Sequence, residues 1–546
     1  MAEPAFNSRR SPVYSTRGVV AASQPLAVAA GLEVLSKGGN AADAAVAAAA
    51  ALNVTEPNST GLGGDCFALY FNAHTGQVSA LNGSGRAPAA LTLERLRHEG
   101  FGLELPPYHV HTITVPGACA GWCDLIERFG RLPLSASLSP AIRLAEQGFP
   151  VAPITAHAWE YGVRRQLRTA PGGGELTIDG RAPRPGEIFS NPGLARTLRL
   201  IAEGGKGAFY QGVIAEAIAV TVQAVGGCMT VDDLATHAGT WENPVSTLYR
   251  GLRLWECPPN GQGLAALLAL NILEGFDLAE LEPLSARRLH LQIEALRLAF
   301  TDTRWYVADP AFGRVPVDEL LDKGYAARRR AMIHLDRAAL NQQRGMPVAA
   351  SDTVYLSVVD SQGDACSFIN SNYMGFGTGI VPPGCGFSLQ NRGHNFSLDP
   401  QHPNALAPRK RPYHTIIPAL ATRPAPNQAA PERLFACFGV MGGFMQPQGH
   451  LQVVVGLVDD GLDPQAVLDR PRFCITGGQV DGRVALEEGI PDTVMADLAG
   501  MGHPVMPVSG FERSVFGRGQ VILRDPDSGV LCAGSDPRAD GCAMTY

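Results

Sequence analysis

The first feature that could do chemistry is a threonine at the start of a predicted strand. Thr353 opens "TVYLSVV", whose alternating apolar residues predict a strand, and "DSQGD" predicts the turn into a second strand, Ala365 to Ile369. A threonine that becomes a chain N-terminus carries a nucleophile and a base together, because its own α-amine can take the hydroxyl proton. The ordinary pKa of that amine is about 7.7–8.0, close to neutral pH. Thr353 is therefore a candidate nucleophile, although strand propensity also favours threonine here.

A glycine-rich turn supplies the second candidate. "GVMGG", Gly439 to Gly443, lies between a predicted strand, Leu434 to Gly439, and a predicted helix, Gln448 to Val458. The first N–H groups of a helix have no acceptor within it, so a turn of this kind can stabilise an oxyanion. An ordinary strand-to-helix turn has the same pattern, and the spacing does not decide between the two.

Other common catalytic patterns are missing from the sequence. There is no G-x-S-x-G, H-E-x-x-H or Walker A motif, and "GLGGD", Gly61 to Asp65, lacks the dinucleotide fingerprint. Cys119 and Cys123 form the only close cysteine pair, with no second Cys/His pair at metal spacing. We therefore expect neither a metal ion nor an organic cofactor.

The elements that would position these residues predict an α+β or layered fold. The first part of the chain is predicted to be mainly helical. Two of its helices are separated by Gly38-Gly39, with Asn40 as the N-cap of the second, and a long amphipathic helix is predicted from Leu289 to Phe300. Strands dominate after Asp352, among them Gln520 to Leu523. The segment "NQQRGMPVAASD" before Thr353 is polar and small, as an exposed linker should be.

Composition limits the class of protein. The chain has 546 residues, 45% hydrophobic and 17% charged, which is typical of a globular protein. A net charge of -7 argues against nucleic acid and anionic membrane as partners. The N-terminal residues lack an apolar signal segment, and the richest apolar stretch, Ala41 to Leu52, is too short to span a bilayer. Eleven scattered cysteines predict free thiols, and with them a cytoplasmic location.

Several blocks in a fixed order carry a resemblance that covers almost the whole chain. They include "EPNSTGLGGDCFALY", "PPNGQGLAALLALNIL", "DTVYLSVVDSQGDA", "KRPYHTIIP" and "GSDPRADG". Together they resemble the γ-glutamyltranspeptidase family of N-terminal nucleophile hydrolases. The resemblance implies a four-layer αββα sandwich, self-cleavage between Asp352 and Thr353, and an acyl-threonine intermediate. A large subunit, 1–352, and a small subunit, 353–546, would then intertwine into one folded unit.

The family's site residues transfer unevenly. Ser371 falls where the family has a hydroxyl partner for the nucleophile, and Gly442 and Gly443 match its oxyanion glycines. The family's arginine for the substrate α-carboxylate aligns near Ser84, with Arg86 two positions on. The remaining substrate-binding positions are occupied by different side chains, namely Tyr373, Arg392, Asn395, His414 and Thr415.

The substitutions change the charge that the substrate meets. The family's aspartate that pairs with a substrate ammonium is replaced by neutral Asn395, and Arg392 is a new cation beside it. An ammonium next to an arginine is repelled by roughly 1–4 kcal/mol, whereas a carboxylate is held in a bidentate contact. We therefore expect a small amide that bears a carboxylate. "INSNYMGFGTG" and "LQNRGHNFSLDP" resemble the branch that includes oxamate amidohydrolase.

Two other interpretations remain open from the sequence. The chain could be a γ-glutamyl hydrolase or transferase that acts on glutathione or on glutaryl-type amides. It could also be an unprocessed relative that keeps the fold without the chemistry. In the leading interpretation, the two subunits stay associated as a heterodimer. A homodimer of these processed heterodimers is compatible with that interpretation.

Overall fold

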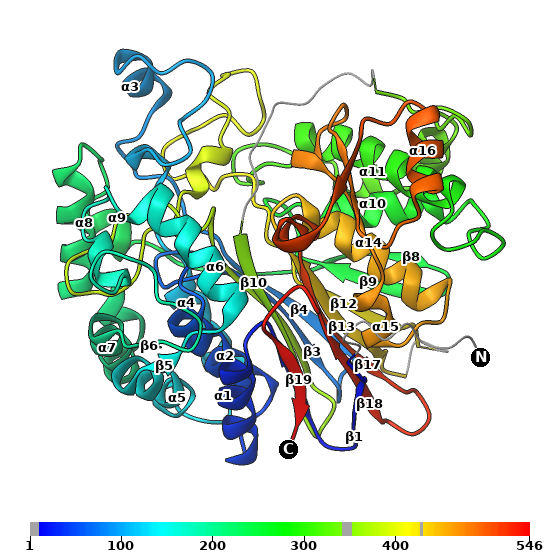
Figure 1. The fold of residues 1–546 in the computed structure, drawn as a ribbon. Coiled ribbons are helices and arrows are strands. Elements are labelled where there is room, and N and C mark those ends of the chain that lie inside the picture. The colour runs from blue at the N-terminus through cyan, green and yellow to red at the C-terminus, as the bar shows by residue number, and fades with distance from the viewer. Residues whose placement is uncertain (1–9, 341–351, 426–429) are drawn as a thin grey trace.

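Two seven-stranded antiparallel sheets form the centre of the molecule (Figure 1). The computed structural model describes residues 10–340, 352–425 and 430–546. In order across the first sheet the strands are β1 (Val13–Ser15), β18 (Leu531–Ser535), β17 (Arg518–Arg524), β13 (Arg433–Met441), β12 (Ala419–Arg423), β9 (Leu252–Glu256) and β8 (Val245–Tyr249). The second sheet runs β19 (Cys542–Thr545), β2 (Val19–Ala22), β10 (Asp352–Val359), β11 (Ala365–Tyr373), β3 (Asp65–Asn72), β4 (Gln77–Gly83) and β7 (Thr240–Glu242). The predicted mixture of helix and sheet is confirmed, and the hairpin from Thr353 is the antiparallel pair β10–β11.

The two sheets face one another across an apolar cluster. Phe67 and Tyr355 from the second sheet meet Cys437 and Ile522 from the first in this cluster. Successive side chains of a strand point to opposite faces. The odd-numbered residues of β10 therefore face the first sheet, and Val354, Leu356 and Val358 pack with helices on the other side.

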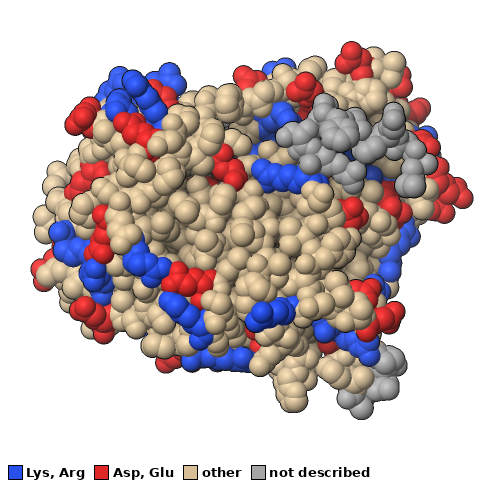
Figure 2. Space-filling model, turned by 60° about the horizontal axis from the view of Figure 1, so that its bottom comes forward, with Lys and Arg blue, Asp and Glu red and all other residues tan. Residues whose placement is uncertain are grey.

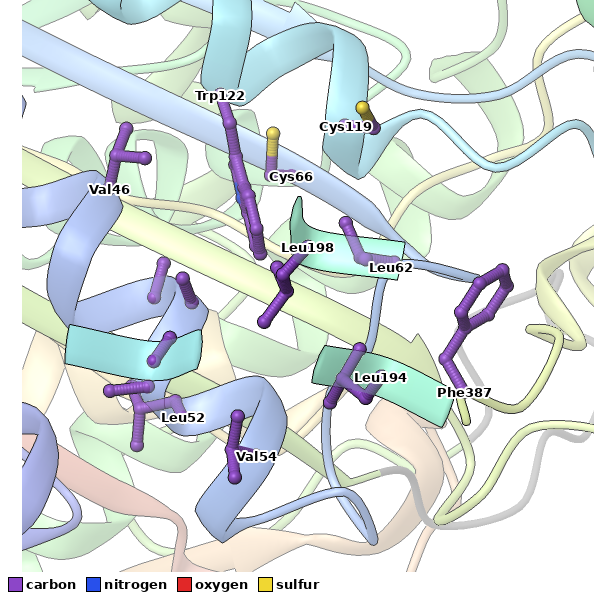
Figure 3. Packing of buried hydrophobic residues seen from close by; sticks show 14 of the residues in the cluster. Val46, Leu52, Val54, Leu62, Cys66, Cys119, Trp122, Leu194, Leu198 and Phe387 are labelled. Atoms are coloured by element: carbon purple, nitrogen blue, oxygen red, sulfur yellow. The ribbon is translucent and has the colours of Figure 1, made fainter. Parts of the chain in front are cut away.

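Helices α1 (Pro25–Ser36), α2 (Ala41–Thr55) and α4 (Ala118–Phe129) pack against the second sheet within one apolar cluster, part of which Figure 3 shows. Asn40 caps α2 as predicted, since its side chain accepts from Ala42 N at 3.1 Å and Asp43 N at 3.2 Å. The cluster also ties α4 to β11. The indole Nε1–H of buried Trp122 donates to Asn370 Oδ1 at 3.0 Å, which fixes the residue before Ser371.

A second group of helices packs against the first sheet. Helices α10 (Gly263–Leu273), α11 (Ala286–Tyr306) and α14 (Met445–Val458) share an apolar cluster with β9, β12 and β13. The helices predicted over Leu289–Phe300 and Gln448–Val458 lie within α11 and α14. The other helices are α3 (Leu93–His98), α5 (Leu134–Gln147), α6 (Pro153–Gly162), α7 (Pro192–Tyr210), α8 (Val213–Ala224), α9 (Val231–Ala235), α12 (Val317–Leu321), α13 (Lys323–Arg330), α15 (Pro464–Asp469) and α16 (Asp492–Gly500). Two smaller sheets contain β5 (Phe149–Pro150) with β6 (Ile188–Phe189), and β14 (Phe473–Ile475), β15 (Val484–Glu487) and β16 (Val505–Val508).

Both large sheets combine strands from before and after residue 352. Strand β10 lies between β2 and β11, and β11 in turn pairs with β3. The sequence pattern of helices first and strands second is therefore incomplete, because the first part also contributes the central strands β2 and β3. Asp540, near the C-terminus, caps α6 by accepting from Ile154 N at 3.1 Å and Thr155 N at 2.8 Å. Any cut before Thr353 would leave these contacts between the two pieces intact.

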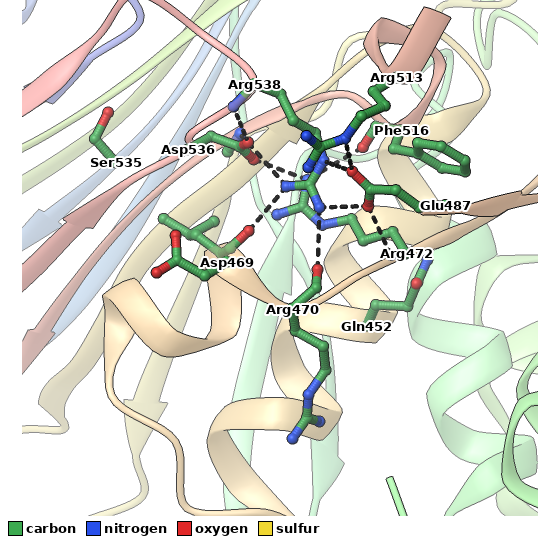
Figure 4. A network of polar contacts seen from close by, with 12 residues as sticks. Gln452, Asp469, Arg470, Arg472, Glu487, Arg513, Phe516, Ser535, Asp536 and Arg538 are labelled. Carbon is green, nitrogen blue, oxygen red and sulfur yellow. Dashed lines mark hydrogen bonds and ion pairs between the residues drawn. The ribbon is translucent and has the colours of Figure 1, made fainter. Parts of the chain in front are cut away.

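The motif "GSDPRADG" is held by a buried ion network (Figure 4). Arg472 Nη1 donates to Asp536 Oδ2 at 2.8 Å, and Arg538 Nε donates to Glu487 Oε1 at 2.7 Å. The Gly519 N–H also donates to Asp536 Oδ2 at 2.8 Å. The network thus fixes the beginning of β17, the strand next to β13. Buried charges of this kind are tolerated because each carboxylate has several donors.

Charges of both signs are interspersed on the molecular face in Figure 2, without a continuous basic stripe. Within the described residues, no helix combines the length and apolarity needed to cross a membrane. All eleven cysteines are free thiols. The predicted linker "NQQRGMPVAASD" lies almost wholly outside the described residues.

Candidate active site

Thr353 lies at an irregularity in the sheet. Asp352 pairs with Tyr373 and Val354 with Asn370, so the register between β10 and β11 shifts at Thr353. Such β-bulges re-aim a side chain and are frequent beside active sites. The fully buried Thr353 side chain places its Oγ1 3.0 Å from Ser371 Oγ on β11. The two hydroxyls that the sequence singled out are therefore in direct contact.

The Ser371 hydroxyl is held from two further sides. Its Oγ accepts from the Tyr373 N–H at 2.9 Å and from Arg392 Nη2 at 3.2 Å. The neighbouring Asn370 Nδ2 donates to Thr60 Oγ1 at 2.8 Å. The hydroxyl beside Thr353 is thus fixed by both backbone and side-chain donors.

Arg392 is a buried cation that lies one hydroxyl away from Thr353. It belongs to the short 3₁₀ helix η4 (Arg392–Asn395), and its Nη1 donates to Thr415 Oγ1 at 2.6 Å. The guanidinium lies over the Tyr373 ring, 4.3 Å from its centroid. Its Nε has no hydrogen-bond partner, and no carboxylate among residues 10–340, 352–425 and 430–546 forms an ion pair with it. Burial lowers the pKa of Arg392 to about 10, so it is charged at neutral pH.

Tyr373 adopts a strained backbone at this site. Its φ of 82° lies in the left-handed region, which a bulky residue rarely occupies. The ring contact with Arg392 and a hydrogen bond from its hydroxyl to Asn395 Oδ1 at 2.6 Å hold it there. Asn395 Nδ2 in turn donates to Tyr413 O at 3.1 Å. Tyr373, Arg392, Asn395 and Thr415, four of the residues that the sequence interpretation named, therefore form one connected group.

His414 is paired with Asp65, a residue that the sequence interpretation missed. His414 Nε2 lies 3.0 Å from Asp65 Oδ2, and both side chains are fully buried. Burial and the charge of Arg392 together lower the pKa of His414 to about 3, so the imidazole is neutral at neutral pH. Asp65 Oδ1 accepts from Gly85 N at 3.0 Å, Gly117 N at 3.1 Å and Gln390 Nε2 at 2.9 Å.

Burial alone would raise the pKa of Asp65, but the hydrogen bond from His414 and the charge of Arg392 outweigh it, and the pKa lies below its ordinary value. The Asp65 side chain is thus ionised. Asp65 on β3 is the Cα pairing partner of Ser371 on β11. The sequence interpretation treated "GLGGD" only as a possible nucleotide motif. A carboxylate directly after two glycines, at the start of a buried strand, was the available signal.

Gly442 and Gly443 follow the strand that faces β10. Ser357 Oγ donates to Cys437 O at 3.2 Å, and a methyl group on Gly439 would lie 2.5 Å from the Tyr355 ring. Met441 is the last residue of β13, so the two glycines directly follow the end of the strand that faces β10. Their φ values of 127° and 58° require glycine. Within the described part of the chain, neither N–H donates a backbone hydrogen bond.

Arg86 lies apart from this group. Its Nη1 donates to Ala238 O at 3.1 Å, and none of its described hydrogen bonds reaches the residues around Thr353. The structure therefore brings together Thr353, Ser371 and the residues around Arg392, but it does not place Arg86 among them.

A separate group of side chains has the composition of a metal site. His290, Glu294 and His503 have ligand atoms within 4.8 Å of one another. His290 Nδ1 and His503 Nε2 share a hydrogen bond of 2.8 Å, however, and Glu294 Oε1 pairs with Arg297 Nε at 3.4 Å. A cation bound here would be repelled by the Arg297 guanidinium. His503 Nδ1 and Glu294 Oε1 have no hydrogen-bond partner among the described residues.

Comparisons with known proteins agree along the whole chain. The family model described as gamma-glutamyltranspeptidase matches residues 27–546. The glutathione hydrolase-like YwrD proenzyme of Bacillus subtilis (strain 168) is 38% identical over 97% of this chain and 99% of its own length. The oxamate amidohydrolase proenzyme of Klebsiella pneumoniae subsp. pneumoniae is 35% identical, with the same coverage of 97% and 99%. The crystal structure of cephalosporin acylase from Bacillus halodurans superposes with a TM-score of 0.92 at 46% identity, covering 100% of this chain and 99% of that one.

Proposed function

Because the chain belongs to the γ-glutamyltranspeptidase family, we propose that it is an amidohydrolase that cleaves its own chain before Thr353 and then uses Thr353 as its nucleophile. Two of the compared relatives are named as proenzymes, and the third as an acylase. Residues 1–352 would form the large subunit and 353–546 the small subunit. With helices outside both packed sheets, the architecture is that of a four-layer αββα sandwich.

The first reaction is an acyl shift within the precursor. Thr353 Oγ1 attacks the carbonyl carbon of Asp352, the peptide C–N bond breaks, and the nitrogen keeps its proton and gains the hydroxyl proton. Water then hydrolyses the resulting ester, which releases the Asp352 carboxylate and regenerates the Thr353 hydroxyl. The product carries a free α-amine on the residue that holds the nucleophile.

Turnover uses the same atoms. The Thr353 amine takes the Oγ1 proton as the oxygen attacks the substrate amide carbonyl, and the developing oxyanion is stabilised by the Gly442 and Gly443 N–H groups. The proton passes to the leaving amine as the C–N bond breaks. Water hydrolyses the acyl-threonine ester and releases the acid. Apart from water, these steps use only groups of the chain and of the substrate.

The observation that carries the substrate assignment is the unpaired charge of Arg392. Its guanidinium is fully buried and has two hydroxyl partners, Ser371 and Thr415, with an unused Nε–H. A buried cation without a paired anion is costly, so an anionic ligand binds there favourably. Arg392 Nη2 and Thr353 Oγ1 are separated only by Ser371 Oγ. A carboxylate held by Arg392 therefore lies close to the attacked carbonyl, as in oxamate or a similarly short acid amide.

A substrate ammonium lacks a partner in the same group. Asn395 is neutral, His414 is neutral, and both Asp65 oxygens already accept hydrogen bonds from the protein. These contacts support a carboxylate-bearing amide over a γ-glutamyl compound such as glutathione.

Incubation of the purified, cleaved protein with oxamate and with glutathione tests the proposal. We expect ammonia from oxamate and little glutamate from glutathione. Thr353→Ala is the inactive control, because it lacks the proposed nucleophile and should stay uncleaved. Preferential release of glutamate from glutathione would overturn the substrate assignment. Equal turnover by wild type and by Thr353→Ala would overturn the assigned nucleophile.

A further inference from the structure

Gln262 connects two segments of the site that are far apart in the sequence. It precedes α10 and is fully buried. Its amide Nε2 donates to Thr415 O at 2.6 Å and to Gly443 O at 2.8 Å. Its Oε1 accepts from the Tyr413 hydroxyl at 3.2 Å, and its backbone N–H donates to His414 O at 3.0 Å. The side-chain amide and the backbone N–H of Gln262 therefore both form hydrogen bonds with residues of the site.

The first of these segments, Tyr413 to Thr415, carries groups that face the proposed substrate. Thr415 Oγ1 accepts from Arg392, and the Tyr413 carbonyl accepts from Asn395. A parallel bridge between Gly261 and His414 aligns this segment with the chain before Gln262. Gln262 thus holds the segment that anchors the carboxylate-binding arginine.

The second segment is the turn at Gly442 and Gly443. Both glycines have positive φ, so the orientation of their peptide groups is not fixed by the ordinary preferences of a strand or helix. The hydrogen bond from Gln262 Nε2 restrains the Gly443 carbonyl and with it the turn. Because both amide hydrogens belong to one planar group, the positions of Thr415 O and Gly443 O are fixed relative to each other.

We propose that Gln262 is a positioning residue that sets the distance between the carboxylate-binding Arg392 and the oxyanion-binding glycines. This inference rests on the proposed function. A substrate held at one end by Arg392 must present its carbonyl to Thr353 and its oxygen to the glycines at the same time. Without the two hydrogen bonds from Gln262 Nε2, the segment that anchors Arg392 shifts relative to the glycine turn. A misplacement of about 1 Å costs roughly a hundredfold in rate.

The first test uses Gln262→Glu and Gln262→Met, which keep the approximate volume of the side chain and remove one or both amide donors. With cleaved protein, we expect kcat/KM to fall about a hundredfold on a carboxylate-bearing amide, which Arg392 and the glycines hold at the same time, and less on a neutral amide, which uses the glycines alone. Arg392→Ala should likewise affect the charged amide more than the neutral one. Activity per cleaved chain equal to wild type on both substrates would overturn the proposal.

The matched control is Gln465→Glu. Gln465 is a buried glutamine whose Nε2 donates to Ser535 O at 3.0 Å and whose Oε1 accepts from Ser535 N at 3.0 Å. It bridges backbone groups as Gln262 does, but in α15 and β18. We expect Gln465→Glu to lose stability and retain wild-type kcat/KM per folded chain. An equal loss of kcat/KM in both variants would show that burying a carboxyl group, and not the link, causes the effect.

The second test does not depend on activity or cleavage. Hydrogen exchange is measured by mass spectrometry on uncleaved Thr353→Ala protein, with and without Gln262→Glu. We expect faster exchange around 413–417 and around 442–446 together, and no such change with Gln465→Glu. Unchanged exchange in either segment would overturn the link even if no substrate were ever found. A changed exchange without any amidase activity in wild type would instead refute the proposed function and leave the link standing.

Discussion

Removal of the Arg392 guanidinium separates a carboxylate-binding role from a structural one. In Arg392→Ala the donors to Ser371 Oγ at 3.2 Å and Thr415 Oγ1 at 2.6 Å disappear, together with the charge. Self-cleavage should persist, because the Asp352–Thr353 bond and the Thr353 hydroxyl are unchanged. Turnover of a carboxylate-bearing amide should fall sharply.

The expected loss has two parts. A charge-assisted contact with the substrate carboxylate is worth about 1.5–3 kcal/mol, roughly ten- to a hundredfold in kcat/KM. The lost hydrogen bond to Ser371 is worth about 0.5–1.5 kcal/mol and affects every substrate, because Ser371 contacts Thr353. A neutral amide should therefore lose at most about tenfold, and a charged amide should lose the product of both factors.

The assay compares kcat/KM for oxamate with that for a neutral amide of similar size, in wild type, Arg392→Ala and Arg392→Lys. Lysine should recover little on oxamate, because an ammonium cannot reproduce the planar guanidinium fork. Thr415→Val serves as the control, since it removes one partner of Arg392 and leaves the cation in place. Equal losses on the charged and the neutral amide would refute the reasoning and return Arg392 to a structural role.

Three further outcomes follow from the same contacts. Thr353→Ala should remain a single chain without activity on a denaturing gel and by mass spectrometry, and cleavage in that variant would exclude self-cleavage by Thr353. The cleaved pieces should elute together in size exclusion without denaturant, because both sheets combine strands from both pieces; separate peaks would contradict this. Burial lowers the pKa of His503 to about 3, below the ordinary value of about 6.5, so the unfolded chain binds more protons and stability falls as pH falls below that value. Urea unfolding at several pH values should show this slope, at most about 1.4 kcal/mol per pH unit from this group, and His503→Gln should reduce it.

The hairpin that begins at Thr353 was predictable because it depends on local pattern. The strand, the turn and the returning strand from Ala365 to Ile369 follow from alternation and turn residues, whereas Ser371 was expected beside Thr353 only from the family resemblance. Helix α2 was predicted from its Asn40 cap, and α11 and α14 from their periodicity, because these signals are also local. Nothing long-range is needed to define these elements.

The contacts made by Asp65 and Gln262 could not be predicted, because they join segments separated by 153 to 349 residues. Asp65 reaches His414, and Gln262 reaches both Thr415 and Gly443. No local rule assigns partners to a buried polar side chain, although its burial implies that partners exist. Arg86 was suggested by its position two residues after Ser84, and its described side-chain hydrogen bond goes to Ala238 O, so its role in the site stays a prediction.

Two buried charged groups lie near Thr353, the Asp65 carboxylate and the Arg392 guanidinium, and only the guanidinium keeps an unused donor, its Nε–H. Asp65 is satisfied by its own N–H donors, so its influence on Arg392 acts through space without an ion pair. This is enough to keep the buried guanidinium charged, yet it leaves the guanidinium with unused hydrogen-bonding capacity. A closer carboxylate from the protein would stabilise Arg392 further, but it would compete with the substrate for the same donors. Under the proposed function, placing the protein's carboxylate at a distance and neutral hydroxyls in contact would favour a substrate carboxylate as the direct partner of Arg392, next to the proposed nucleophile Thr353.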